Sequence, residues 1–337
     1  MNPFDPSSFN HRTEKLTTGH TYHFVDQLPP GYNRNTPTLL LLHVFFVFHM
    51  DSNPLVRYGW RYQIGPWARR GWRIIVPDCL GYGGTDKPSE LSAYTIGSVC
   101  CDLAALLDHT GVDRVIVIGH DWGAEIAWRL CLYYPLRVSM VACLSIPFFP
   151  PARSFVTLEA SVKKAPEFAY QVYFADEAST KEIENNLDFF LNLILYSGAE
   201  VTRWAPVSCP PHFEVPVMGI HRLIWRFEFY LQAFRNSLAG PLSYYKTKRL
   251  RFDEEKEANL PSALPASLPA LFVRGTMDPT SQLRHAIRSK DFVPSLKITT
   301  LAGAGHWLMV QRKDEVTTLI ADWIETTLHT GRSQAKL

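Results

Sequence analysis

A tight turn with a carboxylate at its centre is the first place in the sequence that could do chemistry. Residues 117–124 read VIGHDWGA, with Asp121 in the middle, a strand-like run before it and a helix-like run after it. Glycine on both sides suits such a turn, because side chains beside the central residue would collide. A carboxylate attacks an alkyl carbon without prior deprotonation. We therefore interpret Asp121 as a covalent nucleophile; the alternative is an acid that only caps the next helix.

A histidine and a second acid follow along the chain, and both are needed to hydrolyse the ester that Asp121 would form. His306 lies in GAGHW after the last predicted strand, and Asp278 lies in RGTMDP after the preceding one. The chain order nucleophile, acid, base is that of hydrolases with this type of turn. We predict that His306 activates water and that Asp278 orients it. A structural histidine and a turn aspartate are the alternatives.

Alternating strand and helix patterns predict the frame that positions these residues. Short apolar runs predict buried strands, and apolar residues spaced three and four apart predict amphipathic helices between them. The predicted strands are 38–42, 72–77, 114–118, 139–146, 270–274 and 296–301, and the predicted helices include 96–107 and 316–328. Strands buried on both faces and alternating with helices predict an α/β fold with a mostly parallel, doubly wound sheet.

An insertion interrupts this alternation. Residues from 148 to about 245 carry no strand series and contain a helix pattern over 223–234. They lead to a charged, proline-punctuated connector that includes 253–257. We predict a helical cap over 148–248, inserted into a core made of 1–147 and 249–337.

Composition limits the classes of function. The chain has 337 residues, of which 46% are hydrophobic, and a formal net charge of +2, so we expect no nucleic-acid partner. Its longest apolar run, 38–50, is shorter than the ~20 residues that span a bilayer, and its polar N-terminus lacks the apolar stretch of a signal peptide. The six cysteines have no metal-type spacing, which favours reduced thiols, and we expect no metal and no cofactor. We expect a cytoplasmic protein, with peroxisomal import as an open alternative because the C-terminal Ala335-Lys336-Leu337 resembles a peroxisomal signal.

The segments around Asp121, Asp278 and His306, together with the segment 78–88, resemble the soluble epoxide hydrolase family in its fungal-type form. Asp78–Pro88 (DCLGYGGTDKP) is similar to the family's loop after a core strand, and the resemblance extends over about 22–328. It implies an α/β-hydrolase fold with an inserted helical cap. It also implies that a small-molecule epoxide and water react to give a vicinal diol without a cofactor. The oligomeric state stays open.

Two tyrosines of the predicted cap complete the site that the resemblance implies. Tyr170 begins YQVYF and Tyr245 lies in LSYYKT, and both segments are similar to cap segments of the family. The resemblance assigns Tyr170 and Tyr245 to holding the epoxide oxygen, which needs a proton as the ring opens. We expect Tyr173 and Tyr244 to pack with their hydroxyls at the surface; the alternatives are that Tyr170 or Tyr245 has this packing role, or that one pair is out of register. The neighbours expected to bind substrate are Gln171 and Trp307.

The loop after the first core strand departs from the family. Where the family has His-Gly-x-Pro, this chain has His43 followed by an apolar segment without that glycine and proline. The resemblance places one oxyanion donor in this loop, aligned with Phe45, and the other at the backbone N–H of Trp122. Glycine and proline fix the backbone angles that aim such an N–H into a site. We therefore expect a weakened second donor and slow ester hydrolysis.

Two other functions fit parts of the pattern. A haloalkane- or haloacid-type dehalogenase also uses an aspartate nucleophile on this fold, but it needs donors for a halide, and the paired tyrosines favour an epoxide. A catalytically silent binding protein would keep the fold and its pocket. The altered loop after His43 favours that alternative, whereas the intact set Asp121, Asp278 and His306 argues against it.

Overall fold

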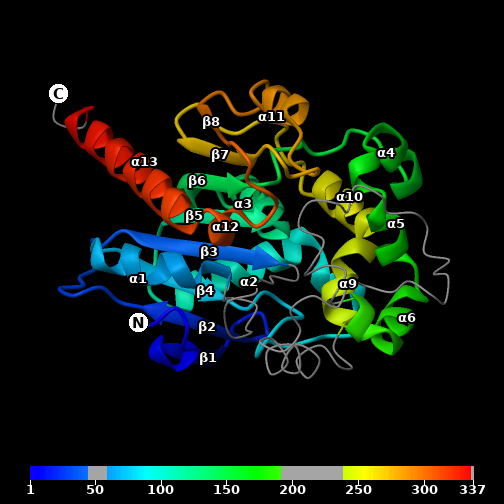
Figure 1. Cartoon of the computed structure of the whole chain (residues 1–337), viewed down its shortest axis with the longest axis horizontal. Helices are drawn as coiled ribbons and strands as arrows, with labels where there is room; N and C mark the ends of the chain where they lie inside the picture. The colour runs from blue at the N-terminus through cyan, green and yellow to red at the C-terminus, as the bar shows by residue number, and fades with distance from the viewer. Residues whose placement is uncertain (45–58, 191–237, 335–337) are drawn as a thin grey trace.

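An eight-stranded sheet forms the centre of the computed structural model, which describes residues 1–44, 59–190 and 238–334. Its strand order is β1-β2-β4-β3-β5-β6-β7-β8 (Figure 1). The strands are β1 (His11–Lys15), β2 (Thr21–Gln27), β3 (Thr38–Val44), β4 (Arg73–Pro77), β5 (Val115–Asp121), β6 (Val138–Leu144), β7 (Ala270–Gly275) and β8 (Leu296–Leu301). The pairs β1/β2 and β2/β4 are antiparallel and the other pairs are parallel. The predicted mostly parallel sheet is confirmed.

Helices cover both faces of the sheet. The helices before β6 are η1 (Pro6–Ser8), α1 (Arg61–Arg69), η3 (Leu91–Tyr94), α2 (Ile96–His109), α3 (Trp122–Tyr133) and η4 (Pro135–Arg137). Those after β7 are α11 (Leu283–Ser289), α12 (Leu308–Gln311) and α13 (Lys313–Gln334). One apolar cluster joins the sheet to α2 and α3, and a second joins its other face to α1, α12 and α13. Successive residues of β3 divide between the two clusters, as side-chain alternation along a strand requires.

Between β6 and β7 the described residues form helices only. These are α4 (Leu158–Lys164), η5 (Pro166–Phe168), α5 (Tyr170–Ala175), α6 (Ser179–Asn185), α9 (Ala239–Lys246) and α10 (Lys248–Glu257). They gather on the right of Figure 1, beyond the end of β3. The expectation of a connector over 253–257 is wrong, because these charged residues form the last turns of α10, where Glu254 and Glu255 contact α2 and α3. The helix pattern over 223–234, Phe45 and the terminal Ala335-Lys336-Leu337 lie outside the described residues.

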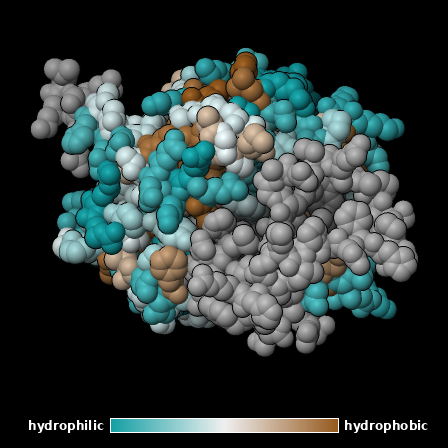
Figure 2. All heavy atoms as spheres, in the orientation of Figure 1, coloured by the Kyte–Doolittle hydropathy of each residue, from teal (hydrophilic) through white to brown (hydrophobic). Residues whose placement is uncertain are grey.

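The described surface is mainly hydrophilic on the face that Figure 2 shows, with hydrophobic residues in scattered spots. Most large apolar side chains are instead buried in the two clusters beside the sheet. Among the helices that the structure describes, none has the length and apolarity to cross a membrane.

Candidate active site

The turn at Asp121 is fixed by close backbone contacts on both sides. Asp121 ends β5 with φ 55° and ψ −124°, and α3 begins at the next residue. A Cβ atom added to Gly119 would lie 2.2 Å from the carbonyl oxygen of Gly123, and one added to Gly123 would lie 2.3 Å from that of Leu42. Real side chains do not fit at these distances, so glycine at both positions is what permits the positive φ of Asp121.

His306 and Asp278 meet Asp121 at this end of the sheet. Nε2 of His306 lies 3.3 Å from Oδ2 of Asp121, and Nδ1 of His306 lies 3.1 Å from Oδ2 of Asp278. The other oxygen of Asp278 accepts hydrogen bonds from the backbone N–H and the hydroxyl of Thr280, at 3.0 and 2.7 Å. The three residues singled out in the sequence therefore form a connected carboxylate–imidazole–carboxylate chain.

Two side chains that the sequence did not single out hold the backbone of His306. Its carbonyl oxygen lies 2.9 Å from Nε2 of His120 and accepts a hydrogen bond of 3.0 Å from the hydroxyl of Ser145. His120 precedes the nucleophile in β5, and Ser145 follows β6 with φ 70°. The sequence carried no clear signal for Ser145, because the predicted strand 139–146 includes it, whereas β6 ends at Leu144 in the structure.

The groups around His306 favour its positively charged form. Burial alone would lower the pKa of His306, but the charge of Asp278 and the hydrogen bond with Asp121 outweigh it and raise that pKa to about 10. Burial likewise opposes ionisation of Asp278, yet His306 and Thr280 hold the pKa of its carboxyl below the usual range. Burial lowers the pKa of His120 well below that of free histidine, so this neighbouring imidazole stays neutral. The site thus holds one imidazolium between two carboxylates at neutral pH.

The two predicted tyrosines face each other beside the nucleophile. The ring centroids of Tyr170 in α5 and Tyr245 in α9 are 6.2 Å apart, and that of Tyr245 is 5.2 Å from the ring of Trp122. Burial raises the pKa of both hydroxyls, and the charge of Asp121 raises both further. Both phenols are therefore protonated at neutral pH and can donate.

The neighbouring tyrosines behave differently from each other. Tyr173 is half-buried and lies away from Asp121, beside the carboxylate of Glu182. Tyr244 is fully buried, and its hydroxyl donates a 2.9 Å hydrogen bond to the carbonyl of Leu80. The expectation that the Tyr244 hydroxyl lies at the surface is wrong, because the loop around Leu80 encloses it.

A cavity of about 350 Å³ opens at Asp121. Its walls include Trp122, Tyr170 and Gln171, together with the apolar side chains of Ile146, Phe149 and Phe168. Gln171 thus lies where a substrate contact was expected. Trp307 packs its ring against those of His306 and His120, with centroids 4.8 and 5.3 Å apart. Among the described residues, no cluster of histidine, cysteine and acidic side chains could hold a metal ion.

Of the two predicted oxyanion donors, only the backbone N–H of Trp122 lies in the described part of the chain. The N–H of Trp122 is in the first turn of α3, where backbone donors have no acceptor within the helix. In the pairing of β3 with β5, Val44 lies directly opposite Asp121. The chain therefore leaves β3 next to the nucleophile, and Phe45 is the first residue beyond the described part of that strand.

Comparisons with known proteins agree with this geometry. Residues 37–313 match a family described as the alpha/beta hydrolase fold. An epoxide hydrolase of Neurospora crassa is 27% identical over 97% of this chain and 98% of its own length. The crystal structure of epoxide hydrolase A from Mycobacterium thermoresistibile superposes with a TM-score of 0.77 and 26% identity, over 94% of this chain and 98% of that one. A bifunctional epoxide hydrolase 2 of Sus scrofa is 28% identical over 99% of this chain, which spans 58% of that relative's length.

Proposed function

Because this chain belongs to the α/β-hydrolase fold family, we propose that it is an epoxide hydrolase that converts an epoxide to a vicinal diol through an ester on Asp121. The observation that carries the proposal is the pairing of His306 with both Asp121 and Asp278, at 3.3 and 3.1 Å, opposite the buried Tyr245 and the half-buried Tyr170. A dehalogenase would not need a pair of phenols aimed at a developing alkoxide. The names of relatives at 26–28% identity support the same conclusion.

The first step forms the ester. One carboxylate oxygen of Asp121 attacks an epoxide carbon, the carbon–oxygen bond of the ring breaks, and the oxygen takes a proton from Tyr170 or Tyr245. The raised pKa values of these hydroxyls keep both protonated until the alkoxide forms. In free enzyme, protonated His306 stabilises the attacking carboxylate rather than acting as a base.

Formation of the ester itself converts His306 into a base. Asp121 loses its charge when it is alkylated, so one of the two groups that raise the pKa of His306 disappears. The imidazolium proton can then neutralise the tyrosinate left by the first step. Neutral His306 removes a proton from water as the water attacks the ester carbonyl, and the N–H of Trp122 stabilises the resulting oxyanion. On collapse the ester oxygen leaves as an alkoxide and takes the remaining proton from the Asp121 carboxyl group, which releases the diol and restores the carboxylate.

The altered loop after β3 bears on this second step. Val44 pairs with Asp121, and the resemblance assigns to the following loop an oxyanion donor for the ester carbonyl. Loss of one oxyanion donor typically costs ~10²–10³-fold in rate. We propose that ester hydrolysis limits turnover and that the alkyl-enzyme accumulates. Rapid mixing should reveal a burst of alkyl-enzyme; equal rates for the two steps would contradict this part of the proposal.

A single turnover in oxygen-18 water tests the ester route directly. Enzyme in excess over a styrene-type epoxide probe is quenched after one turnover, and the peptide containing Asp121 is analysed by mass spectrometry. We expect one heavy oxygen in the Asp121 carboxyl and none in the diol, because water attacks the ester carbonyl. Enzyme incubated without epoxide is the control. Label that appears only in the diol would mean that water attacks the epoxide directly, and the ester route would be rejected.

A further inference from the structure

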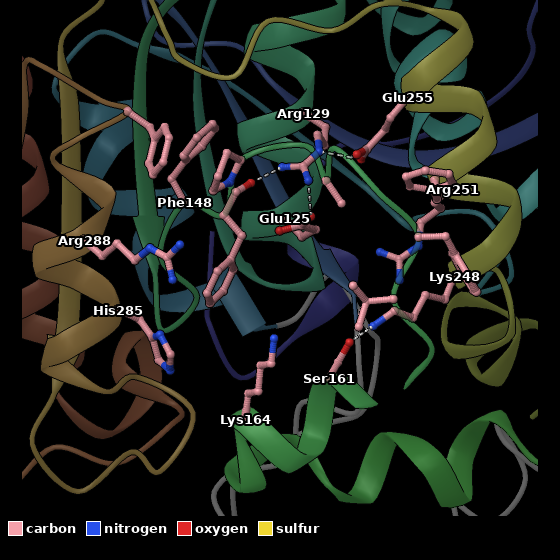
Figure 3. A pocket seen from close by; sticks show the side chains of 17 residues that line it. Glu125, Arg129, Phe148, Ser161, Lys164, Lys248, Arg251, Glu255, His285 and Arg288 are labelled. Carbon is pink, nitrogen blue, oxygen red and sulfur yellow. Dashed lines mark hydrogen bonds and ion pairs between the residues drawn. The ribbon is translucent and has the colours of Figure 1, made fainter. Parts of the chain in front are cut away.

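A second cavity adjoins the cavity at Asp121. It measures about 460 Å³ and lies among α3, α4, α10 and α11 (Figure 3). We call it the basic chamber. The two cavities share five lining residues, namely Glu125, Phe149, Ser161, Lys248 and Arg251. The two cavities are therefore adjacent, and these side chains form the boundary between them.

Positive charge exceeds negative charge in the basic chamber. Its only carboxylates among the described residues are Glu125 and Glu255, and Arg129 pairs with both, at 3.3 and 2.7 Å. Within the described chain, four further cations that line the chamber have no carboxylate within 4.0 Å; these are Lys164, Lys248, Arg251 and Arg288. Figure 3 shows these side chains arranged around the same space.

Arg251 stands at the boundary between the two cavities. Its guanidinium carbon lies 4.8 Å from the centre of the Trp122 ring, one residue beyond the nucleophile. Its Nε is buried and has no hydrogen-bond partner among the described residues. Nearby, Nζ of Lys248 donates a 2.5 Å hydrogen bond to the hydroxyl of Ser161. Burial lowers the pKa of both cations, and nearby carboxylates such as Glu125 and Glu255 beside Arg251 do not fully offset this effect.

The side chains that line the basic chamber indicate what kind of negatively charged molecule fits there. They include the rings of Phe148, Phe149, Phe155, Phe252 and Phe292, which suit a carbon chain rather than a free inorganic anion. The planar fork of an arginine matches the two oxygens of a carboxylate. Lys164 and Arg288 are exposed, so their charges also attract an anion from solvent.

We propose that this enzyme acts on acidic epoxides, whose carbon chain places a carboxylate in the basic chamber while the epoxide lies at Asp121. This inference rests on the proposed function. Arg251 and Lys248 bind the carboxylate, and the phenylalanine rings pack against the chain between the two ends. The same arrangement keeps the substrate's negative charge away from the attacking carboxylate of Asp121.

Paired acid and ester substrates test this inference. The probes are epoxyhexanoate, epoxyoctanoate and epoxyundecanoate with the epoxide at the far end of the chain, each beside its methyl ester. For the chain length that fits, kcat/KM of the acid should exceed that of the ester by at least about tenfold, since a charge-assisted hydrogen bond is typically worth that much. Arg251→Met should remove most of this preference, and Lys164→Met should reduce it by less. Lys256→Met, which removes an exposed charge from the same helix outside both cavities, should leave the preference intact.

Binding without turnover separates the two proposals. Calorimetry with octanoate, and with octanol as the uncharged control, needs no reaction at Asp121. Binding of octanoate that Arg251→Met weakens about tenfold would support the basic chamber, even if none of the epoxides gave a diol and the proposed function failed. Equal turnover of acids and esters, with no octanoate binding to the wild-type protein, would overturn the inference while leaving epoxide hydrolysis in place.

Discussion

At Asp121 each charged group has a partner of opposite sign within 3.3 Å, whereas four cations of the adjoining basic chamber have none in the described chain. The first region is complete by itself: Asp278 and Asp121 raise the pKa of His306, His306 lowers the pKa of Asp278, and Thr280 orients the outer carboxylate. The second region is short of negative charge and has space for a ligand to supply it. The comparison shows two uses of charge: paired charges hold the catalytic groups in the protonation states that the reaction needs, and unpaired charges can bind a substrate of opposite charge.

In the first region, removal of the nucleophile should cause the largest loss of activity. Asp121→Ala should lower diol formation at least about 10⁴-fold, because no other carboxylate can form the ester. His306→Gln should instead permit one alkylation and then stop, so intact-protein mass spectrometry should show stoichiometric alkyl-enzyme. Asp253→Asn on the exposed side of α10 is the control. Diol production by Asp121→Ala at the wild-type rate would reject both the mechanism and the chemical role given to this region.

Removal of the outer carboxylate tests whether the partners set each other's charge. Asp278→Asn should lower kcat roughly 10³–10⁴-fold, since the amide can hold His306 but cannot stabilise its charged form. The pKa of His306, about 10 in the intact site, should fall in this variant. Titration of the imidazole by nuclear magnetic resonance measures that shift directly. An unchanged pKa would mean that Asp278 acts only as packing.

The same pKa predicts how stability changes with pH. Folding raises the pKa of His306 from about 6.5 to about 10, so the native state binds the proton more tightly. This contribution to the free energy of unfolding is fully present below pH 6.5 and is lost as the pH rises through 10. Urea unfolding between pH 7 and pH 10 should therefore show a decline that is smaller in Asp278→Asn. A decline of equal size in both proteins would contradict the assignment.

Substitution of the two tyrosines should lower the alkylation rate by an intermediate amount. Tyr170→Phe and Tyr245→Phe should each lower the alkylation rate by about 10–10²-fold, because the remaining phenol can still donate a proton. The double variant should lose more than either single variant, and ester hydrolysis should be little affected. Tyr173→Phe, on the same helix but half-exposed and away from the nucleophile, is the matched control. Stopped-flow measurement of alkylation distinguishes these outcomes; equal effects of Tyr170→Phe and Tyr173→Phe would reject the assigned role.

The sequence predicted the parts of the molecule that follow from local rules. The glycines around Asp121 and the glycine-rich segment before His306 mark turns after buried strands, and parallel strands bring such turns to one edge. β1 and β2 escaped prediction because these two antiparallel strands carry many polar, partly buried residues rather than an apolar run. The helix at 253–257 escaped because its stability comes from contacts with α2 and α3, through Glu254 and Glu255, and not from an apolar face.

The basic chamber could not be predicted for a similar reason. Its cations come from α3, α4, α10 and α11, which are far apart in the chain and carry no shared spacing. Each of them resembles an ordinary surface charge until the fold places them around one space. The residues of the catalytic turn are adjacent in the sequence and can be recognised there. The excess of positive charge in the basic chamber arises only when the fold brings distant residues together.

The smallest expected effect concerns a contact that only the fold reveals. Ser145 donates a 3.0 Å hydrogen bond to the carbonyl of His306, so Ser145→Ala should loosen the loop that positions the imidazole. A neutral hydrogen bond contributes about 1 kcal/mol, and we expect kcat to fall by a few fold with KM little changed. Ser139→Ala, at the opposite end of β6, removes a comparable hydroxyl-to-carbonyl bond of 2.9 Å far from the site and should leave kcat unchanged. Because a purely structural role would lower stability alone, thermal unfolding and pre-steady-state rates must be measured together. If both variants change stability equally and neither changes kcat, the carbonyl of His306 is held well enough by His120 without Ser145.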